Sequence, residues 1–200
     1  MIAAMHRILV ATLLTLAASA ALAQEGTVST ILIDDKATIR IDTSLGPIVV
    51  ELDPDRAPVT VENFLQLVVD DFYDGTIFHR VAAGFIVQGG GYLPDLTPKL
   101  TTGNVFNESG NGLSNRRGTI AMARGNEAHS ANAQFYFNLV DNNNLNPRPT
   151  RWGYAVFGEV VSGMEIIDQI GSVPTGAGGE FDRDVPIDPV IIERIELIDQ

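Results

Sequence analysis

The sequence predicts a mainly β protein, an antiparallel barrel or sandwich that carries only two helices. Short stretches in which apolar and polar residues alternate recur along the chain, and only two segments show the spacing of an amphipathic helix. The strands do not alternate regularly with helices, which argues against a parallel sheet with crossover helices. A chain of 200 residues suits one domain with a sizeable core.

The first 23 residues predict export. A short segment containing Arg7 precedes an almost unbroken apolar run over 8–18, and Ala21-Leu22-Ala23 has the small-x-small form of a cleavage site. A membrane anchor is the alternative interpretation, but a run of about 11 residues falls well short of the roughly 20 that a spanning helix needs. We therefore expect a signal peptide over 1–23, a linker over 24–35, one domain over 36–200, and no membrane insertion after cleavage.

The predicted domain opens with a β-hairpin. Ile39 and Ile41 alternate with polar residues, a Leu-Gly-Pro turn follows, and 48–52 continue as a β-branched run. A helix is then predicted over 60–69, with Thr60 as its N-cap, because apolar residues follow the i, i+3, i+4, i+7 spacing of one helix face. These apolar residues are Val61, Phe64, Leu65 and Val68.

The rest of the domain is predicted to be short strands, one long loop and a second helix. The stretch over 93–117 is rich in Pro, Asn, Gly and Thr, which predicts a surface excursion. The second helix, of about nine residues, is expected to begin at a capping box formed by Ser162 and Glu165 and to end at Gly171. The predicted strands cover 76–81, 85–88, 119–123, 134–139, 154–160 and 194–197.

Composition excludes several classes of function. The net charge of −12 argues against a nucleic acid or an anionic membrane surface as the main partner. The chain has no cysteine, so disulfides, thiolate metal sites and a cysteine nucleophile are excluded. His79 and His129 lack partners at a metal-ligand spacing, and we expect neither a metal nor a cofactor.

Residues 78–90, FHRVAAGFIVQGG, place a cation among bulky apolar side chains. Arg80 shares one strand face with Phe78, and Gln88 shares one face of the returning strand with Ile86. An arginine in such a setting is usually a surface residue that lies along its aliphatic stem. The pattern alone therefore favours the surface interpretation and leaves a functional role of Arg80 as the alternative.

The same segment resembles the cyclophilin signature, in which Phe-His-Arg is followed by a short turn, Gly-Phe and Gln-Gly-Gly. GTIAMAR at 118–124 and QFYFN at 134–138 resemble the second block of that family, and YAVFG at 154–158 resembles the third. APVTVENF at 57–64 is similar as well. The resemblance runs through the mature chain in order and is closest to the exported bacterial branch.

The resemblance implies a closed eight-stranded antiparallel β-barrel capped by two α-helices, and peptidyl-prolyl cis-trans isomerase activity. It implies that Arg80 and Gln88 are catalytic. The remaining residues are implied to bind the substrate. The apolar proline pocket is formed by Phe85, Ile86, Tyr136 and Leu145, and Gln134 is a polar group of the site. Ala123 and Arg124 provide a backbone strip for the extended peptide, and Tyr154 occupies a rim position.

Three positions depart from the family pattern. Asn144 stands where many members have an aromatic residue at the pocket rim, Ala83 replaces the usual proline, and Tyr136 replaces phenylalanine in the pocket wall. The missing rim aromatic leaves cyclosporin binding open, and the hydroxyl of Tyr136 needs a hydrogen-bond partner. Trp152 either covers part of this gap or packs within a loop or the core.

These inferences together predict an exported, periplasmic, monomeric isomerase that assists the folding of other exported proteins. Its expected partners are unfolded or extended polypeptides that contain proline, and not nucleic acid. Two alternatives remain. A cyclophilin-fold chaperone or scaffold would bind proline-containing segments with little turnover, whereas an acidic extracytoplasmic lectin or ligand-binding barrel would leave the ordered motifs unexplained.

Overall fold

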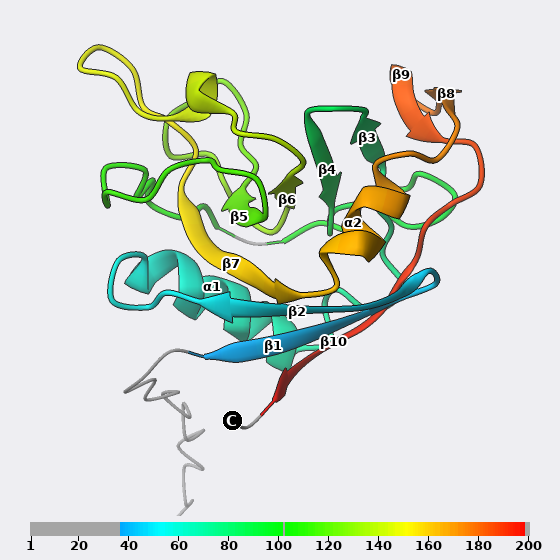
Figure 1. Ribbon diagram of the computed structural model, residues 1–200, viewed down its shortest axis with the longest axis horizontal. Coiled ribbons are helices and arrows are strands. Elements are labelled where there is room, and N and C mark those ends of the chain that lie inside the picture. Colours follow the sequence, from blue (N-terminus) through cyan, green and yellow to red (C-terminus); the bar gives the residue numbers. More distant parts are fainter. Residues whose placement is uncertain (1–36, 102, 199–200) are drawn as a thin grey trace, which may run out of the picture. The chain divides into compact units, whose positions relative to one another are not determined.

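The fold is built on one antiparallel sheet of eight strands (Figure 1). The computed structural model describes residues 37–101 and 103–198, so the predicted signal peptide and linker lie outside the described residues. The strands of this sheet are β1 (Thr38–Thr43), β2 (Gly46–Leu52), β3 (Arg80–Ala82), β4 (Ile86–Gly89), β5 (Thr119–Met122), β6 (Phe135–Asn138), β7 (Val156–Ser162) and β10 (Ile192–Ile198). Their spatial order is β10-β1-β2-β7-β5-β6-β4-β3, which confirms the mainly β class.

Within the described residues the sheet does not close into a barrel, so the expectation of a closed eight-stranded barrel was wrong. It is a strongly curled, open half-barrel whose edges are β3 and β10. Most of the strand predicted over 76–81 is irregular, because Ile77 N donates to Tyr92 O at 2.9 Å and Phe78 N donates to Val190 O at 3.0 Å. One isolated β-bridge, between Ile77 and Ile191, connects the segments that precede β3 and β10.

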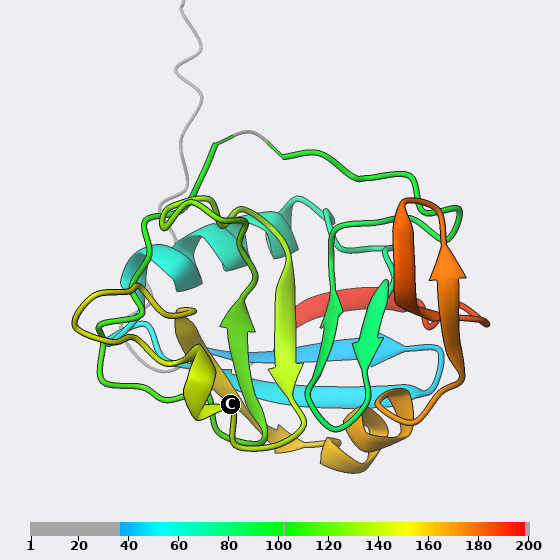
Figure 2. The same cartoon turned by 90° about the horizontal axis from the view of Figure 1, so that it is seen from above.

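A separate hairpin, which the sequence analysis did not predict, stands beside the β3 edge. It consists of β8 (Thr175–Gly178) and β9 (Phe181–Pro186), which form a separate two-stranded sheet. β9 contacts β3, and Figure 2 shows the hairpin next to that strand. A covered edge cannot pair with another chain, so the hairpin protects β3 where the open barrel leaves it unpaired.

The main apolar core joins one face of the sheet to the helices α1 (Pro58–Val69) and α2 (Met164–Ile170). Phe64, on α1, is fully buried, and its ring centroid lies 5.0 Å from that of Tyr73 and 5.2 Å from that of Phe157. Val81, Val87 and Phe137 reach this core from β3, β4 and β6. Since neighbouring residues on a strand point to opposite faces, Arg80, Gln88 and Tyr136 lie on the other side of the sheet.

Helix α1 begins two residues earlier than predicted, and Thr60 is not its N-cap. Proline suits the first helical position, because it has no N–H to leave unpaired there. Ala57 is the N-cap residue and makes no side-chain cap. The carboxylate of Glu108, from the long loop, accepts instead from Val59 N at 3.2 Å, from Thr60 N at 2.8 Å and from the Thr60 hydroxyl at 2.6 Å.

We expect Glu108→Gln to lower the free energy of unfolding by about 1 kcal/mol, because the neutral amide interacts less favourably with the positive end of the helix dipole. Urea unfolding measures this change. The exposed loop carboxylate Glu127 provides a control, and Glu127→Gln should change the stability by less than about 0.5 kcal/mol. Equal stability of the two variants would contradict a capping role for Glu108.

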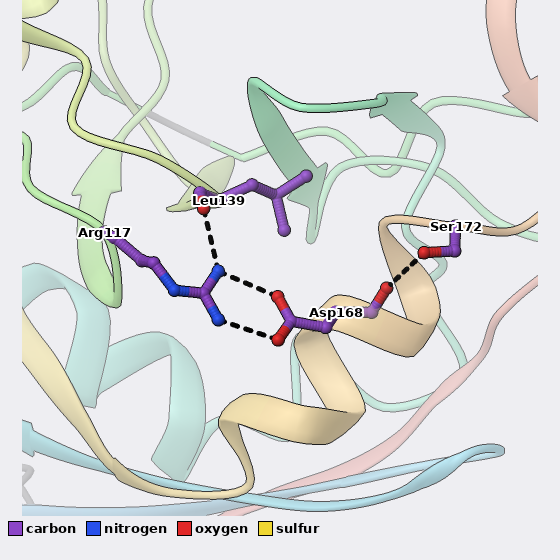
Figure 3. A network of polar contacts seen from close by, with 4 residues as sticks. All are labelled: Arg117, Leu139, Asp168 and Ser172. Carbon is purple, nitrogen blue, oxygen red and sulfur yellow. Dashed lines mark hydrogen bonds and ion pairs between the residues drawn. The ribbon is translucent and has the colours of Figure 1, made fainter.

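Helix α2 is held by a polar contact and not by the predicted capping box. The helix has seven residues, and its N-cap, Gly163, lies in the left-handed region with φ +86° and makes no side-chain cap. Both terminal nitrogens of Arg117 donate to the carboxylate of Asp168 at 2.8 and 2.7 Å, and one donates to Leu139 O at 2.8 Å (Figure 3). This pairing lowers the pKa of Asp168 and ties α2 to the chain around β5 and β6.

Candidate functional site

A row of paired side chains crosses β3, β4, β6 and β5 on the face away from the main core. In the strand register Arg80 lies opposite Gln88, Gln88 opposite Tyr136, and Tyr136 opposite Ala121. Directly opposed residues of antiparallel strands project to the same side of a sheet. The structure therefore brings the two predicted catalytic residues and the pocket tyrosine together in one line, called the site row below.

Arg80 stands at the outer end of the site row. Its side chain is 34 % exposed, so a ligand on this face can reach it. Its Nε lies 3.5 Å from Oδ2 of Asp184, on β9, and this partner was not identified in the sequence. The guanidinium thus contacts a carboxylate through Nε, and part of it remains exposed to a ligand.

A second apolar cluster lies on the same face as the site row. Its buried members are Ile86, Ala121, Ala123, Tyr136, Leu145 and Val156, and Phe85 and Tyr154 pack against it. The short 3₁₀ helix η1 (Asn143–Leu145) supplies Leu145. This pocket cluster gathers all the residues predicted for the proline pocket and also contains Ala123 and Tyr154.

A polar groove adjoins the pocket cluster, and Ala123 belongs to both. The groove has a volume of about 300 Å³, and within it Nε2 of Gln88 donates to Oε1 of Gln134 at 2.9 Å. A groove of this kind can accept the main chain of an extended peptide, with the two amides as donors and acceptors. Its lining residues are Gln88, Ala123, Arg124, Gly125, Ser130, Asn132 and Gln134.

The glycine run after β4 makes room for the groove. A Cβ at Gly91 would lie 2.4 Å from Cγ of Gln134 and 2.7 Å from its Nε2, so only glycine lets the Gln134 side chain occupy its observed position. A Cβ at Gly89 would lie 2.8 Å from the ring of Phe78. The absence of side chains at these two positions therefore permits the close packing of Gln134 and Phe78.

We expect Gly91→Ala to lower kcat/KM for a proline-containing peptide roughly tenfold, because Gln134 must turn away and release Gln88. Steady-state isomerisation kinetics measure the change. Gly110 offers a matched control, since a Cβ there would meet nothing within 4 Å. Gly110→Ala should keep the original rate, and an equally small effect of both substitutions would contradict the role assigned to Gly91.

Arg124 uses its side chain to build the wall of the site. Nη2 donates to Trp152 O at 2.9 Å and Nε donates to Gly153 O at 3.1 Å. The guanidinium carbon also lies 4.6 Å from the centroid of the Tyr154 ring. The side chain of Arg124 is therefore engaged in these contacts. The resemblance implies that the backbone of Arg124 binds the peptide, and these contacts are compatible with that role.

Trp152 packs away from the predicted pocket. Its ring centroid lies 5.1 Å from that of His129 and 6.0 Å from that of Phe106, while 43 % of the residue stays exposed. These contacts favour the packing interpretation of Trp152 over the interpretation in which it replaces the rim aromatic that Asn144 lacks. The Phe106 and His129 rings are stacked at 4.5 Å.

An asparagine network behind the pocket cluster was missed in the sequence. The Tyr136 hydroxyl donates to Oδ1 of Asn115 at 2.7 Å, which gives it the partner that it needs. Asn142 donates to Phe85 O at 2.9 Å and to Oδ1 of Asn138 at 2.8 Å, and all three asparagines are buried. The asparagine-rich loop beside β6 was the only sequence signal for this network.

A family model described as cyclophilin type peptidyl-prolyl cis-trans isomerase/CLD matches residues 38–197. The chain belongs to the cyclophilin-type peptidyl-prolyl cis-trans isomerase family. The match includes both helices of this cyclophilin, the strands of the large sheet up to the penultimate residue of β10, and every predicted site residue.

Similar proteins carry the same family name. Peptidyl-prolyl cis-trans isomerase cyp18 of Streptomyces antibioticus is 48 % identical over 164 residues, with 80 % of this chain and 98 % of the relative covered. Peptidyl-prolyl cis-trans isomerase B of Escherichia coli is 48 % identical over 162 residues, with the same coverage. Isomerase A of Dickeya dadantii is 48 % identical over 160 residues, covering 80 % of this chain and 84 % of the relative. The predicted enzyme class is confirmed.

Solved structures agree with the fold. A cyclophilin type isomerase of Cryptosporidium parvum superposes with a TM-score of 0.64 at 25 % identity and covers 83 % of this chain and 99 % of its own. A second structure of it, in the presence of the dipeptide Ala-Pro, gives a TM-score of 0.63 at 26 % identity, with 82 % and 99 % covered. The roles of single site residues stay predictions.

Proposed function

We propose that this cyclophilin catalyses rotation about X-Pro peptide bonds on the face that carries the site row. The observation that supports it most strongly is the register that aligns Arg80, Gln88 and Tyr136 beside an apolar cluster. The arrangement combines a cation, an orienting amide pair and an apolar pocket. The Ala-Pro dipeptide in the related Cryptosporidium structure supports a proline-containing substrate.

The proposed reaction needs neither nucleophile nor metal. Amide resonance sets a barrier of ~18–20 kcal/mol to rotation about the X-Pro bond, and no covalent bond has to break. In the twisted transition state the prolyl nitrogen becomes pyramidal and regains its lone pair. A donor that reaches this nitrogen only in the twisted state lowers the barrier without stabilising the ground state.

Arg80 is the proposed donor. A guanidinium is always charged and carries five N–H groups, so it can hold a carboxylate at Nε and still donate from its terminal nitrogens. A charge-assisted hydrogen bond contributes about 1.5–3 kcal/mol net. This corresponds to a rate gain of roughly ten- to 150-fold.

The pocket cluster and the groove supply the rest of the proposed catalysis. The proline ring would be held against Phe85, Ile86 and Leu145, where water is excluded and the twisting amide is poorly solvated. Gln88 and Gln134 would hold the neighbouring peptide groups so that rotation is confined to one bond. Gln88 lies opposite Arg80 in the strand register and also lines the groove, so it links the proposed donor to the peptide-binding groove.

Relaxation of a short X-Pro peptide after a solvent jump tests the proposed activity. Catalytic amounts of the purified protein should accelerate the approach to the cis-trans equilibrium without shifting its position. Heat-unfolded protein at the same concentration serves as the control. A relaxation rate equal to the uncatalysed one would overturn the proposed function.

We also propose that the protein is exported to the periplasm and acts there on other exported chains as a monomer. The three-part pattern of 1–23 supports export. Over 37–101 and 103–198, the structure has no helix that is both long and apolar enough to cross a membrane. Expression of the full chain in a Gram-negative host should yield a periplasmic product that begins at Gln24, and deletion of 2–23 should retain it in the cytoplasm. An uncleaved cytoplasmic product of the full chain would contradict export.

A further inference from the structure

Arg80 has a carboxylate partner 104 positions further along the chain. Oδ2 of Asp184 lies 3.5 Å from Arg80 Nε, and the Asp184 side chain is 23 % exposed. Arg183 Nε lies 3.9 Å from the same oxygen, but the Arg183 side chain is 84 % exposed. The partly buried contact to Arg80 is screened less by water than the contact to Arg183.

The backbone of Asp184 adopts an unusual conformation. Its φ is +67°, in the left-handed region that non-glycine residues rarely occupy and that Asp and Asn tolerate best. Such a conformation persists only where the surrounding structure fixes it. Here it occurs at the residue of β9 whose carboxylate contacts Arg80.

The hairpin that carries Asp184 is fixed to the main sheet by side-chain contacts. The Tyr92 hydroxyl donates to Oε1 of Glu180 at 2.8 Å, at the turn between β8 and β9. The Phe181 ring centroid lies 5.1 Å from that of Tyr92 and 5.7 Å from that of His79, the neighbour of Arg80. The carboxylate of Asp184 is thus presented to Arg80 by a hairpin with side-chain contacts at its turn and at the start of β9.

We propose that Asp184 is a positioning residue for Arg80. It holds Nε of the guanidinium, restricts the rotamers of a long side chain, and leaves the terminal nitrogens for the prolyl nitrogen. This inference rests on the proposed function, because it assigns Asp184 a role only through Arg80. It also gives the β8–β9 hairpin a part in catalysis.

The test compares two carboxylates of the same strand. Asp184→Asn keeps the size of the side chain and tolerates a left-handed backbone, and it should lower kcat about three- to tenfold with KM within about twofold. Asp182→Asn makes the same charge change at an exposed position of β9 and should leave both constants unchanged. Asp184→Gly relieves the backbone and should show the same loss of kcat with undiminished thermal stability.

A double-mutant cycle separates failure of this inference from failure of the proposed function. When Arg80→Ala is already in place, Asp184→Asn should cause no further loss of kcat. If Arg80→Ala lowers the rate but Asp184→Asn alone does not, the positioning role is overturned and the proposed function stands. Equal losses from Asp184→Asn with and without Arg80 would also overturn it. If Arg80→Ala itself leaves the rate unchanged, both fail together.

Discussion

Replacing Arg80 with alanine is expected to lower kcat/KM for an X-Pro peptide by roughly ten- to 150-fold, the loss of one charge-assisted hydrogen bond made only in the transition state. The fall should appear mainly in kcat, because the pocket cluster and the groove that bind the ground state remain. Stability should change by less than about 1 kcal/mol, since the Arg80 side chain is 34 % exposed and its ion pair is partly solvated.

Arg183 provides the matched control for this experiment. It is also an arginine beside Asp184, but its side chain is 84 % exposed. Arg183→Ala should keep the original kcat/KM, and Arg80→Lys should fall between the original protein and Arg80→Ala, because lysine keeps the charge without the planar fork. A folded Arg80→Ala variant with undiminished kcat/KM would remove the residue from the mechanism.

Acid is expected to destabilise the protein through His79. The side chain is 1 % exposed, and burial, reinforced by the charge of Arg80, lowers its pKa from 6.5 to about 4. The unfolded chain therefore binds a proton on this residue below pH 6.5, while the folded protein does so only near pH 4. The free energy of unfolding should fall by about 3 kcal/mol between these two pH values.

The variant His79→Phe isolates this contribution. Phenylalanine can make the same ring contacts with Tyr92 and Phe181. The substitution removes the hydrogen bond between the imidazole and the Ile77 backbone, so the slope against pH and not the absolute stability is the readout. Denaturant unfolding at several pH values should give a nearly flat profile between pH 6.5 and 4 for this variant. The original protein, unfolded under the same conditions, provides the reference slope. Parallel slopes for His79→Phe and the original protein would contradict the assignment.

The two carboxylates whose pKa is lowered do not obscure this window. The pKa of Asp168 is lowered from 3.8 by hydrogen bonds from Arg117, and the pKa of Asp95 is lowered from 3.8 by bonds from Thr97. Groups with a lowered carboxylate pKa contribute stability above the unfolded value and lose it only as the pH falls below about 3.8. Their effect therefore begins where that of His79 ends.

Local patterns were sufficient to predict most of the large sheet and α1. Period-two alternation identified β1 and β10, and the spacing of Val61, Phe64 and Leu65 identified the buried face of α1. The β8–β9 hairpin was missed because Thr175–Gly178 reads TGAG, with no apolar alternation, and β9 begins with charged residues after Phe181. Contacts with Tyr92 and β3 stabilise this hairpin, and the spacing of apolar residues in the sequence does not reveal such contacts.

Helix ends were predicted less well than helix faces. The sequence supported Thr60 as a cap and a box from Ser162 to Glu165, yet Glu108 caps α1 from 48 positions away and Gly163 precedes α2. Closure of the barrel also failed, because Ile77 N and Phe78 N donate to Tyr92 O and Val190 O outside the strands, and only Thr76 O accepts from the first residue of β10. At α1 a tertiary hydrogen bond replaced the local one, whereas at α2 no side chain caps the helix.

The candidate site was also predicted in part. Strand parity placed Arg80, Gln88 and Tyr136 on one face once the register was known, and the resemblance named the pocket cluster. Asp184 and Asn115 were not found, because each acts through a side chain far away in sequence. The absence of a metal, a monomeric state and the periplasmic location stay predictions.

Exchange NMR of a proline-containing peptide tests the central claim most directly. With catalytic amounts of the protein, the account predicts cross peaks between the cis and trans resonances of the peptide, and it predicts that Arg80→Ala weakens them while the peptide still binds. A chaperone or scaffold would shift the peptide resonances without producing cross peaks. Binding without cis-trans exchange in the original protein would contradict the account.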